Sequence, residues 1–415
     1  MEREKKQKLL DLFRSKLDRP MRYYLDVCTR CGICKDACFA YASVPKAEYT
    51  PVWRAEVVRK IYKQYFKWTG RLFPFLGNSK EIDDDTMKQL YDAAYTCTGC
   101  RRCMIYCPFG IDTQAIQSIA KLLLIGNESA PEELSMLADT SIEKGKNLEL
   151  YKESFMTGIR NLEKEVVASW KGESDQIIPL DVEGANILYV ALAGAHSIIP
   201  AASILNAARE NWTLSFFEAV NFGAFVGDPR KTQLIAKRII DEAIRLKVKE
   251  VAICECGTAY RVMKHLVGEH PFQVSHIAEV MARYLKQGRI KVEKDRMKEL
   301  ITYHDPCQSA RNSGVIEEPR YVLHQLTSNF TEMTPNREYN LCCGGGGGLV
   351  ALENEPFREE TGKAKVNQIK ETGAAIVTTG CENCHTQLKF LSDRYKSGVK
   401  VEFLTNLVAN SLVLE

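Results

Sequence analysis

The sequence predicts an α+β protein in which an α-helical, cysteine-rich N-terminal domain precedes two tandem α/β halves. The N-terminal third carries two cysteine runs, at residues 28–38 and 97–107, among helical patterns. From residue 186 the pattern changes to short β runs that alternate with helical stretches, which is typical of α/β units. Segments of this second part recur along the chain, which indicates two related halves.

Composition excludes several classes of protein. The 415 residues suffice for two or three domains, and a net charge of +3 argues against nucleic acid as the main partner. The 15 cysteines are an odd number and mostly follow metal-type spacings, unlike a secreted disulfide framework. Residues 1–8 show no signal-peptide pattern, and the longest apolar stretches, such as 186–195, are too short for a membrane span. We therefore expect a cytoplasmic protein that does not itself cross the membrane.

The chain opens with a predicted amphipathic helix at residues 4–17. Packing of this helix on its own domain is the favoured interpretation, and docking to a partner is the alternative. The apolar side chains that lie on or near one face are Leu9, Leu10, Leu12, Phe13 and Leu17.

The strongest signal is a pair of runs with the spacing C-x-x-C-x-x-C-x-x-x-C. The second run ends with Pro108, as in bacterial ferredoxins, whereas the first has Phe39 at that place. Three closely spaced thiolates wrap one face of a [4Fe–4S] cubane, and the fourth cysteine ligates the other cluster. A zinc site would use separate C-x-x-C pairs instead. The prediction is one cubane on Cys28, Cys31, Cys34 and Cys107, and a second on Cys97, Cys100, Cys103 and Cys38.

The segment between the two runs is 58 residues long, far more than in compact ferredoxins, and its parts at 51–54 and 59–68 are basic and aromatic. One interpretation is a docking surface for an acidic electron donor or a membrane-subunit loop. The favoured one is a solvated basic face with aromatic side chains packed beneath it. After the second run, Asp112 is expected to cap a helix that continues to Leu124. Pro131 then marks the start of a charged, helical scaffold.

The second part of the chain reads as α/β units. Helical patterns lie between the β runs, for instance at 231–246 and 357–371. The predicted strands are 187–192, 213–217, 250–254, 272–274, 300–304, 375–379 and 399–403.

The internal repeat pairs residues 250–259 with 375–384, and 186–194 with 299–307. In this register the first half has a cysteine at only one of the positions that carry the second half's cysteine set. We therefore expect one complete set of cysteines and not two. Cys254 and Cys256 are interpreted as buried structural thiols, with a redox or substrate-facing role as the alternative. Cys256 matches Cys381, while Gly194, Asn221-Phe222-Gly223 and Ala259 stand where the second half has Cys307, Cys342-Cys343-Gly344 and Cys384.

The second half carries a single cysteine, an adjacent pair and a C-x-x-C. Adjacent cysteines are poorly placed to bond each other, but both can reach different irons of one cluster. The run of glycines removes every Cβ after the pair, so the backbone of Gly344, Gly345 and Gly346 can approach a bulky ligand. The alternatives are five structural thiols beside a flexible linker, and a nucleotide loop, which lacks the expected strand and acidic residue. The five cysteines are Cys307, Cys342, Cys343, Cys381 and Cys384.

This single Cys, CCG and C-x-x-C pattern resembles the CCG domain of heterodisulfide reductases. The order of parts resembles the catalytic iron–sulfur subunit of that family, and a single intact set is closest to its homologue in membrane complexes of sulfate reducers. The resemblance implies a non-cubane [4Fe–4S] cluster on the five cysteines. It also implies a ferredoxin-like domain at 1–127 and a helical linker at 128–184. A degenerate CCG-type half at 185–295 and an intact one at 296–415 would follow.

In this family the cubanes deliver single electrons, and the non-cubane cluster is where a disulfide is cleaved or formed. His304 and His385 flank the cluster cysteines and are candidate proton donors to the leaving thiolate. For His304 a hydrogen bond within its Tyr-His-Asp-Pro turn is an equal alternative. Glu382 and Asn383 are candidates to support the cluster ligands.

The resemblance also implies partners and rival functions. The partners would be other subunits of a redox complex (a flavoprotein, a cytochrome or a membrane subunit), with a disulfide-bearing small protein or a small thiol as substrate. Such a subunit would be cytoplasmic and held at the inner face of the membrane through a partner. One rival is a non-catalytic electron-transfer subunit of a membrane-linked or bifurcating complex. The other is the iron–sulfur subunit of a flavin-dependent 2-hydroxyacid oxidase.

Overall fold

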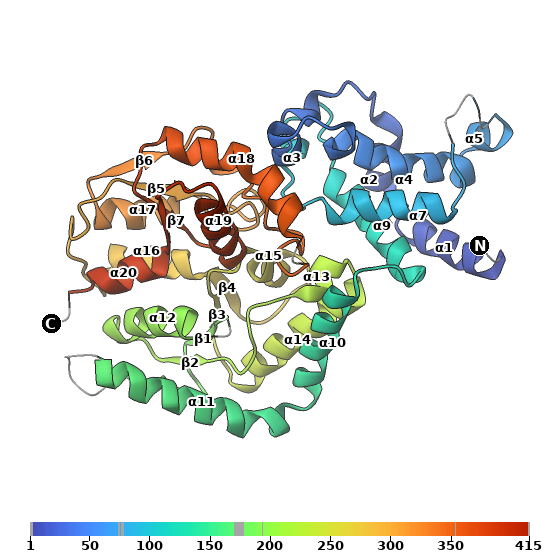
Figure 1. Ribbon diagram of the computed structural model, residues 1–415. Coiled ribbons are helices and arrows are strands. Elements are labelled where there is room, and N and C mark those ends of the chain that lie inside the picture. Colours follow the sequence, from blue (N-terminus) through green and yellow to red (C-terminus); the bar gives the residue numbers. More distant parts are fainter. Residues whose placement is uncertain are drawn as a thin grey trace.

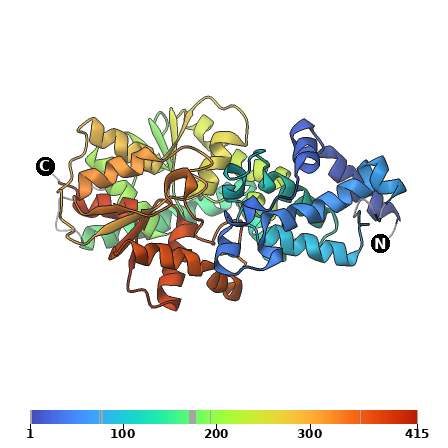
Figure 2. The ribbon, with the colours of Figure 1, turned by 90° about the horizontal axis from the view of Figure 1, so that it is seen from above.

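The computed structural model describes residues 3–73, 75, 79–169, 178–192, 194–352 and 354–413. A helical N-terminal region and a larger α/β part lie end to end, with the two ends of the chain at opposite extremes (Figures 1 and 2). The two parts meet where α3 (Phe39–Ser43) packs against α18 (Glu355–Glu371), and where the start of the second cysteine run meets the glycine-rich loop of the α/β part.

The N-terminal region is a cluster of helices around one apolar core. The predicted opening helix is confirmed as α1, and its Leu9 and Phe13 are fully buried against the region's own helices. Asp112 caps α9 as predicted, since its carboxylate accepts a hydrogen bond from the backbone N–H of Ala115. The helices are α1 (Arg3–Ser15), α2 (Arg19–Val27), α3 (Phe39–Ser43), α4 (Pro51–Phe66), α5 (Trp68–Leu72), α7 (Asp84–Tyr95), α8 (Arg102–Ile105) and α9 (Thr113–Gly126).

The basic and aromatic segment is more deeply buried than the sequence suggests. Tyr62 packs beneath the surface as expected, but Arg54 and Arg59 are also buried, at 2% and 1% exposure. The prediction of a solvated basic face is therefore wrong for these two arginines. The Nε–H group of Arg59 donates to the carbonyl of Leu25 over 2.9 Å, which compensates part of its lost hydration.

Two helices connect the N-terminal region to the α/β part. As predicted from Pro131, a helix begins at the next residue, α10 (Glu132–Lys146), and it is followed by α11 (Leu148–Ser169). They run along one side of the first α/β half (Figure 1). The expected domain limits at 127, 184 and 295 remain predictions.

Each α/β half holds one four-stranded parallel sheet, and the two sheets have the same strand order, β2-β1-β3-β4 and β6-β5-β7-β8. The predicted fold class is thus confirmed. One strand, β6, was not predicted, because its three residues are half-exposed at a sheet edge and form no apolar run. The strands are β1 (Ile187–Val190), β2 (Trp212–Leu214), β3 (Glu250–Ile253), β4 (Gln273–His276), β5 (Ile301–His304), β6 (Phe330–Glu332), β7 (Ile376–Thr379) and β8 (Lys400–Phe403).

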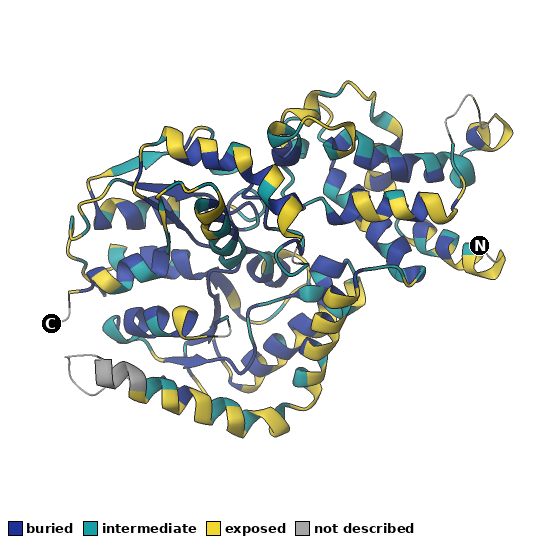
Figure 3. Cartoon of the chain, viewed as in Figure 1, coloured by how far each residue is buried: buried dark blue, intermediate teal, exposed yellow. Residues whose placement is uncertain are grey.

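Helices cover both sheets, and the inner strands of both sheets are buried (Figure 3). One core cluster joins side chains of both halves, and a second holds four cysteines of the second half together with Cys38, Phe39 and Ala40. Among the described residues, no helix combines the length and the apolar character that a membrane span requires. The helices are α12 (Ala195–Ala207), α13 (Phe222–Val226), α14 (Pro229–Arg245), α15 (Gly257–His265), α16 (Ile277–Lys286), α17 (Glu317–Leu326), α18 (Glu355–Glu371), α19 (Glu382–Arg394) and α20 (Leu404–Ser411).

Candidate functional site

The cysteines of the second half meet at the carboxyl ends of two neighbouring parallel strands. Cys307 follows β5, and Cys381 follows β7, which pairs with β5. Cys381 is also the residue before α19, so Cys384 lies in the first turn of that helix. The carboxyl edge of an open α/β sheet is the usual place for a bound ligand, because side chains from successive loops converge there.

The adjacent cysteines come from the glycine-rich loop. The backbone N–H of Gly344 lies 3.4 Å from Cys342 Sγ, and that of Gly345 lies 3.4 Å from Cys343 Sγ. Backbone donors of the glycine run therefore point at sulfur. All five cysteines of the set are buried, with exposures of 8% or less.

The glycine loop is wedged against the second cysteine run of the N-terminal region. At Gly347 the backbone is left-handed (φ +70°), and an added Cβ would lie 2.5 Å from the carbonyl oxygen of Cys97. It would also lie 2.9 Å from the Cα of Thr98. Only glycine permits this approach of the two backbones.

Replacing Gly347 by alanine is expected to destabilise the protein by about 1–3 kcal/mol, because it adds both backbone strain and a clash with another segment. Gly314→Ala is the matched control, since Gly314 also has a positive φ (+82°) but faces open space. Chemical denaturation under anaerobic conditions measures both variants. Equal losses of unfolding free energy would contradict the close approach at Gly347.

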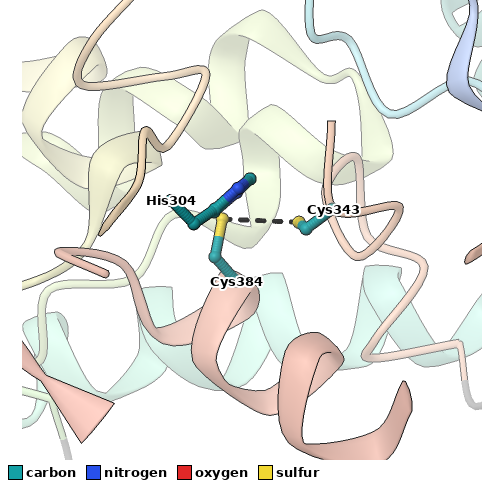
Figure 4. Close-up of side chains that lie close together, drawn as sticks. All are labelled: His304, Cys343 and Cys384. Carbon is teal, nitrogen blue, oxygen red and sulfur yellow. Dashed lines mark hydrogen bonds between the residues drawn. The ribbon is translucent and has the colours of Figure 1, made fainter. Parts of the chain in front are cut away.

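His304 lies among the cysteine sulfurs (Figure 4). One ring nitrogen of His304 and the sulfurs of Cys343 and Cys384 all lie within 4.8 Å of one another, and the two sulfurs are 3.3 Å apart. Within the described part of the chain, neither nitrogen of this fully buried ring has a hydrogen-bond partner. Burial, together with nearby Lys365, holds the pKa of His304 well below its usual value. A buried ring with two unsatisfied nitrogens is costly, so the site fits a bound group that supplies a partner.

His385, the second predicted histidine, is placed differently. Its ring stacks on Phe403 with centroids 4.0 Å apart, and burial lowers its pKa. The neighbouring His196 donates from Nε2 to the carboxylate of Glu382 over 3.1 Å. The structure thus brings His304 into the cysteine group and places His385 on an aromatic stack beside it.

The thiols of the set are electrostatically linked to the N-terminal region. Hydrogen bonds from Cys100 and from Cys307 lower the pKa of Cys342. Hydrogen bonds from Cys342 and Cys384 hold the pKa of Cys343 well below its usual value. Cys100 belongs to the second cysteine run, so the two thiol groups are in contact. A hydrogen bond from Cys384 likewise lowers the pKa of Cys381, whereas hydrogen bonds and burial raise the pKa of Cys307 and Cys384. A buried group of thiols that includes such low-pKa members is a suitable donor set for a soft, positively charged metal centre.

The two N-terminal cysteine runs interleave in space. A cavity beside α4 is lined by the first three cysteines of the first run, and by Cys103 and Cys107 of the second. A neighbouring cavity is lined by the last cysteine of the first run and by the first three of the second. Burial raises the pKa of Cys34 to about 11, and the nearby Cys28 and Cys107 thiols add to this rise. The arrangement fits two metal clusters with exchanged fourth ligands.

Three residues near these sites were missed. Arg54 Nη1 lies 3.4 Å from Cys38 Sγ, and Thr98 Oγ1 lies 3.4 Å from Cys342 Sγ. Lys365 is fully buried, and burial lowers its pKa to about 8. The nearby Cys343 thiol acts in the opposite direction and raises that pKa more than any other thiol does. For Arg54 and Lys365 a signal existed, since each is a charged residue on the buried, apolar face of its helix. Thr98 carried no such signal.

Cys254 and Cys256 lie in the core of the first half, at 1% and 5% exposure. Burial raises the pKa of both thiols, to about 12 for Cys256. The favoured interpretation, buried structural thiols, agrees with this placement.

Comparison with known proteins agrees with the geometry. Residues 24–111 match the 4Fe-4S dicluster domain family, and residues 301–389 match the CCG cysteine-rich domain family. An Hdr-like menaquinol oxidoreductase iron-sulfur subunit of Archaeoglobus fulgidus is 28% identical, over 96% of this chain and 81% of its own. A subunit of the dihydromethanophenazine:CoB–CoM heterodisulfide reductase of Methanosarcina acetivorans is 29% identical, over 94% of each chain.

The dicluster match implies two cubanes, and the CCG match suggests a further cluster. The chain therefore joins a 4Fe–4S dicluster domain to a CCG domain and is a homologue of the iron–sulfur subunits of heterodisulfide reductase-like oxidoreductases.

Proposed function

We propose that this chain passes single electrons through two [4Fe–4S] cubanes to a non-cubane [4Fe–4S] cluster, where a disulfide is reduced or formed. The observation that carries the proposal is the buried group of five cysteines, two of which lie beside His304 and one of which interacts with Cys100 of the second cubane set. The five cysteines would hold the third cluster with their thiolates, and backbone N–H groups of the glycine loop would support it.

The spacing of the cysteines, together with the two cavities, supports three ligand sets. The first cubane would be held by Cys28, Cys31, Cys34 and Cys107, the second by Cys97, Cys100, Cys103 and Cys38, and the third cluster by Cys307, Cys342, Cys343, Cys381 and Cys384. When bound, the third cluster would supply one-electron chemistry and an iron at which sulfur can be held.

The surrounding residues exclude water and orient the reacting sulfur. In its neutral form His304 offers one N–H donor, and its ring faces Cys343 and Cys384. We assign to it a hydrogen bond to sulfur at this site. Its low pKa leaves the ring neutral at pH 7, so it has no acidic proton to give, and the proton for the leaving thiolate comes from another source. Lys365, held by the side-chain oxygens of Asn340 and Gln368, adds a positive charge beside the thiolates. A positive charge favours electron uptake by a thiolate-bound cluster.

The names of the relatives suggest the partners. They refer to menaquinol, to dihydromethanophenazine and to a heterodisulfide. We propose that this chain likewise works with other redox subunits at the inner face of the membrane. The disulfide would belong to a small partner protein or to a small thiol.

In a stoichiometric test, the chemically reduced holoprotein is oxidised by a small disulfide. The absorbance of the clusters monitors the reaction. Each disulfide should take up two electrons and two protons and yield two thiols. Cys343→Ala should lose this reaction but still be oxidised by ferricyanide, a one-electron acceptor, while Cys256→Ala should behave as the wild type. A wild-type protein that ignores disulfides but exchanges electrons with ferricyanide would favour the electron-relay alternative.

Arg54 should set the potential of the second cubane. It is buried beside Cys38, so it stabilises the reduced, more negative state of a cluster bound there. Arg54→Met is expected to lower that reduction potential by an amount on the order of tens of millivolts. Redox titration followed by electron paramagnetic resonance measures the shift. Arg59→Met, which removes a buried arginine of the same helix, should leave the potential in place, and equal shifts in both variants would contradict the assignment.

A further inference from the structure

A cavity of about 400 Å³ opens where α9, α13 and α15 meet the glycine loop (Figure 1). This volume is within the range of small-molecule sites. Its wall includes Cys97 of the second cubane set and Gly347 of the glycine loop. Gln308, the residue after Cys307, also lines it. The cavity thus lies between the second cubane set and the CCG cysteines.

The cavity carries an excess of positive charge. Lys16, Lys121 and Arg261 line it, and no carboxylate pairs with any of them in the described part of the chain. The only acidic side chain among the described lining residues is Asp112, and Arg101 already binds its carboxylate.

The two inner cations are held in place by neutral groups. Lys121 donates to the carbonyl oxygen of Phe225, and its Nζ lies 4.7 Å from the centre of the Tyr95 ring. Arg261 Nη1 donates to Gln114 Oε1 over 3.1 Å and to Gln308 Oε1 over 3.0 Å. Both side chains are therefore ordered without being neutralised.

This arrangement is unfavourable in the empty cavity. Burial lowers the pKa of Lys121 to about 8, and burial together with nearby Arg101 lowers the pKa of Arg261 to about 10. Both groups are still charged at pH 7. The Cys97 thiol acts against this lowering of the pKa at Lys121, and Asp112 and the Cys307 thiol act against it at Arg261. Neither cation, however, forms an ion pair with a carboxylate in the described part of the chain. Buried charges without an ion-pair partner commonly mark a site that receives the opposite charge from a ligand.

We propose that this cavity binds an anionic small molecule through a carboxylate, sulfonate or phosphate group that is neutralised by Lys121 and Arg261. A guanidinium binds such groups with two parallel hydrogen bonds, and an ammonium binds them as a point charge. The four glutamines that line the cavity supply further donors: Gln114, Gln117, Gln233 and Gln308. The inference goes beyond the proposed redox function, because anion binding does not require a disulfide to react.

The anionic ligand would lie next to the reaction site. Arg261 is near enough to Cys307 for the two groups to interact electrostatically. Gln308 joins the two walls of the cavity. It follows Cys307 in the chain, and its Nε2 donates to the carbonyl of Gly99 in the second cysteine run over 3.2 Å. A molecule bound here would touch the second cubane loop and the loop that carries Cys307.

Isothermal titration calorimetry of the anaerobic holoprotein at pH 7 tests the inference with three probes: inorganic phosphate, mercaptoacetate and neutral 2-mercaptoethanol. We expect at least one of the anions to bind to one site per chain, and 2-mercaptoethanol to bind much more weakly. Arg261→Gln and Lys121→Gln should each weaken anion binding about tenfold or more, which is the effect of losing one charge-assisted contact. Arg160→Gln, which changes an exposed arginine of α11, should have no effect.

The probes also separate the possible sources of the anion. Phosphate binding alone would indicate a free oxyanion or a phosphate ester, and mercaptoacetate binding alone would indicate an organic acid. Absence of binding by both anions would overturn the inference, as would equal binding of 2-mercaptoethanol and mercaptoacetate. Anion binding that survives Arg261→Gln unchanged would also overturn it, even if Lys121→Gln does not fold. Phosphate contains no sulfur, so its binding is independent of disulfide chemistry.

Discussion

Cys343→Ala is expected to remove one four-iron cluster from the protein and to leave both cubanes in place. Cys343 is buried at the centre of the CCG set, beside Cys384 and His304. It belongs to neither cavity that the N-terminal cysteines line. Iron should therefore fall from about twelve to about eight atoms per chain.

Cys256→Ala is the matched control for this experiment. Cys256 is also a buried cysteine just after a parallel strand. It packs in the core of the first half and, although burial and the nearby Cys381 thiol raise its pKa, it belongs to none of the proposed ligand sets. This variant should keep about twelve iron atoms per chain. A wild-type protein with about eight atoms, or a Cys343→Ala variant with an unchanged count, would contradict the third cluster.

Arg320→Met should cause the largest loss of stability, about 3–5 kcal/mol. Asp305 is fully buried, and Arg320 donates to its two carboxylate oxygens over 2.8 and 2.9 Å. The same guanidinium also binds Glu332. Removal of the Arg320 guanidinium leaves the buried carboxylate of Asp305 without its main counter-charge. Asp305 lies two residues before Cys307.

Arg394→Met is the control for this loss. Arg394 forms an exposed ion pair with Glu355, at 2.7 Å, and exposed pairs contribute less than about 1 kcal/mol. Chemical denaturation of both variants under anaerobic conditions gives the two free energies. Equal destabilisation by the two substitutions would show that the buried pair does not hold the Cys307 loop.

Much of the fold could be predicted because its signals are local. The alternation of β runs and helices gave seven of the strands, and the repeat between 250–259 and 375–384 anticipated two sheets of the same order. The edge strand β6 escaped because its pairing with β5 depends on a neighbour and not on its own apolar pattern. Arg54 and Arg59 were misjudged because long basic residues usually reach solvent, although both share the buried, mostly apolar face of α4.

The candidate site was likewise predictable only in its local features. Cysteine spacing predicted which thiols would meet, because loops at the carboxyl ends of parallel strands converge. Contacts between distant segments could not be read from it. Thr98 and Cys342 are 244 residues apart, and the cationic cavity is assembled from the N-terminal region and both halves. No local pattern in the sequence encodes either of them.

The most direct test of the central claim is electron paramagnetic resonance of the oxidised, anaerobic protein with and without an added thiol. A bound third cluster at which sulfur chemistry occurs should give a paramagnetic signal on oxidation, and the thiol should change that signal. The signal should be absent from Cys343→Ala and present in Cys256→Ala. A third cluster that is present by iron content but unaffected by every thiol would contradict disulfide chemistry at this site and leave electron transfer as the function.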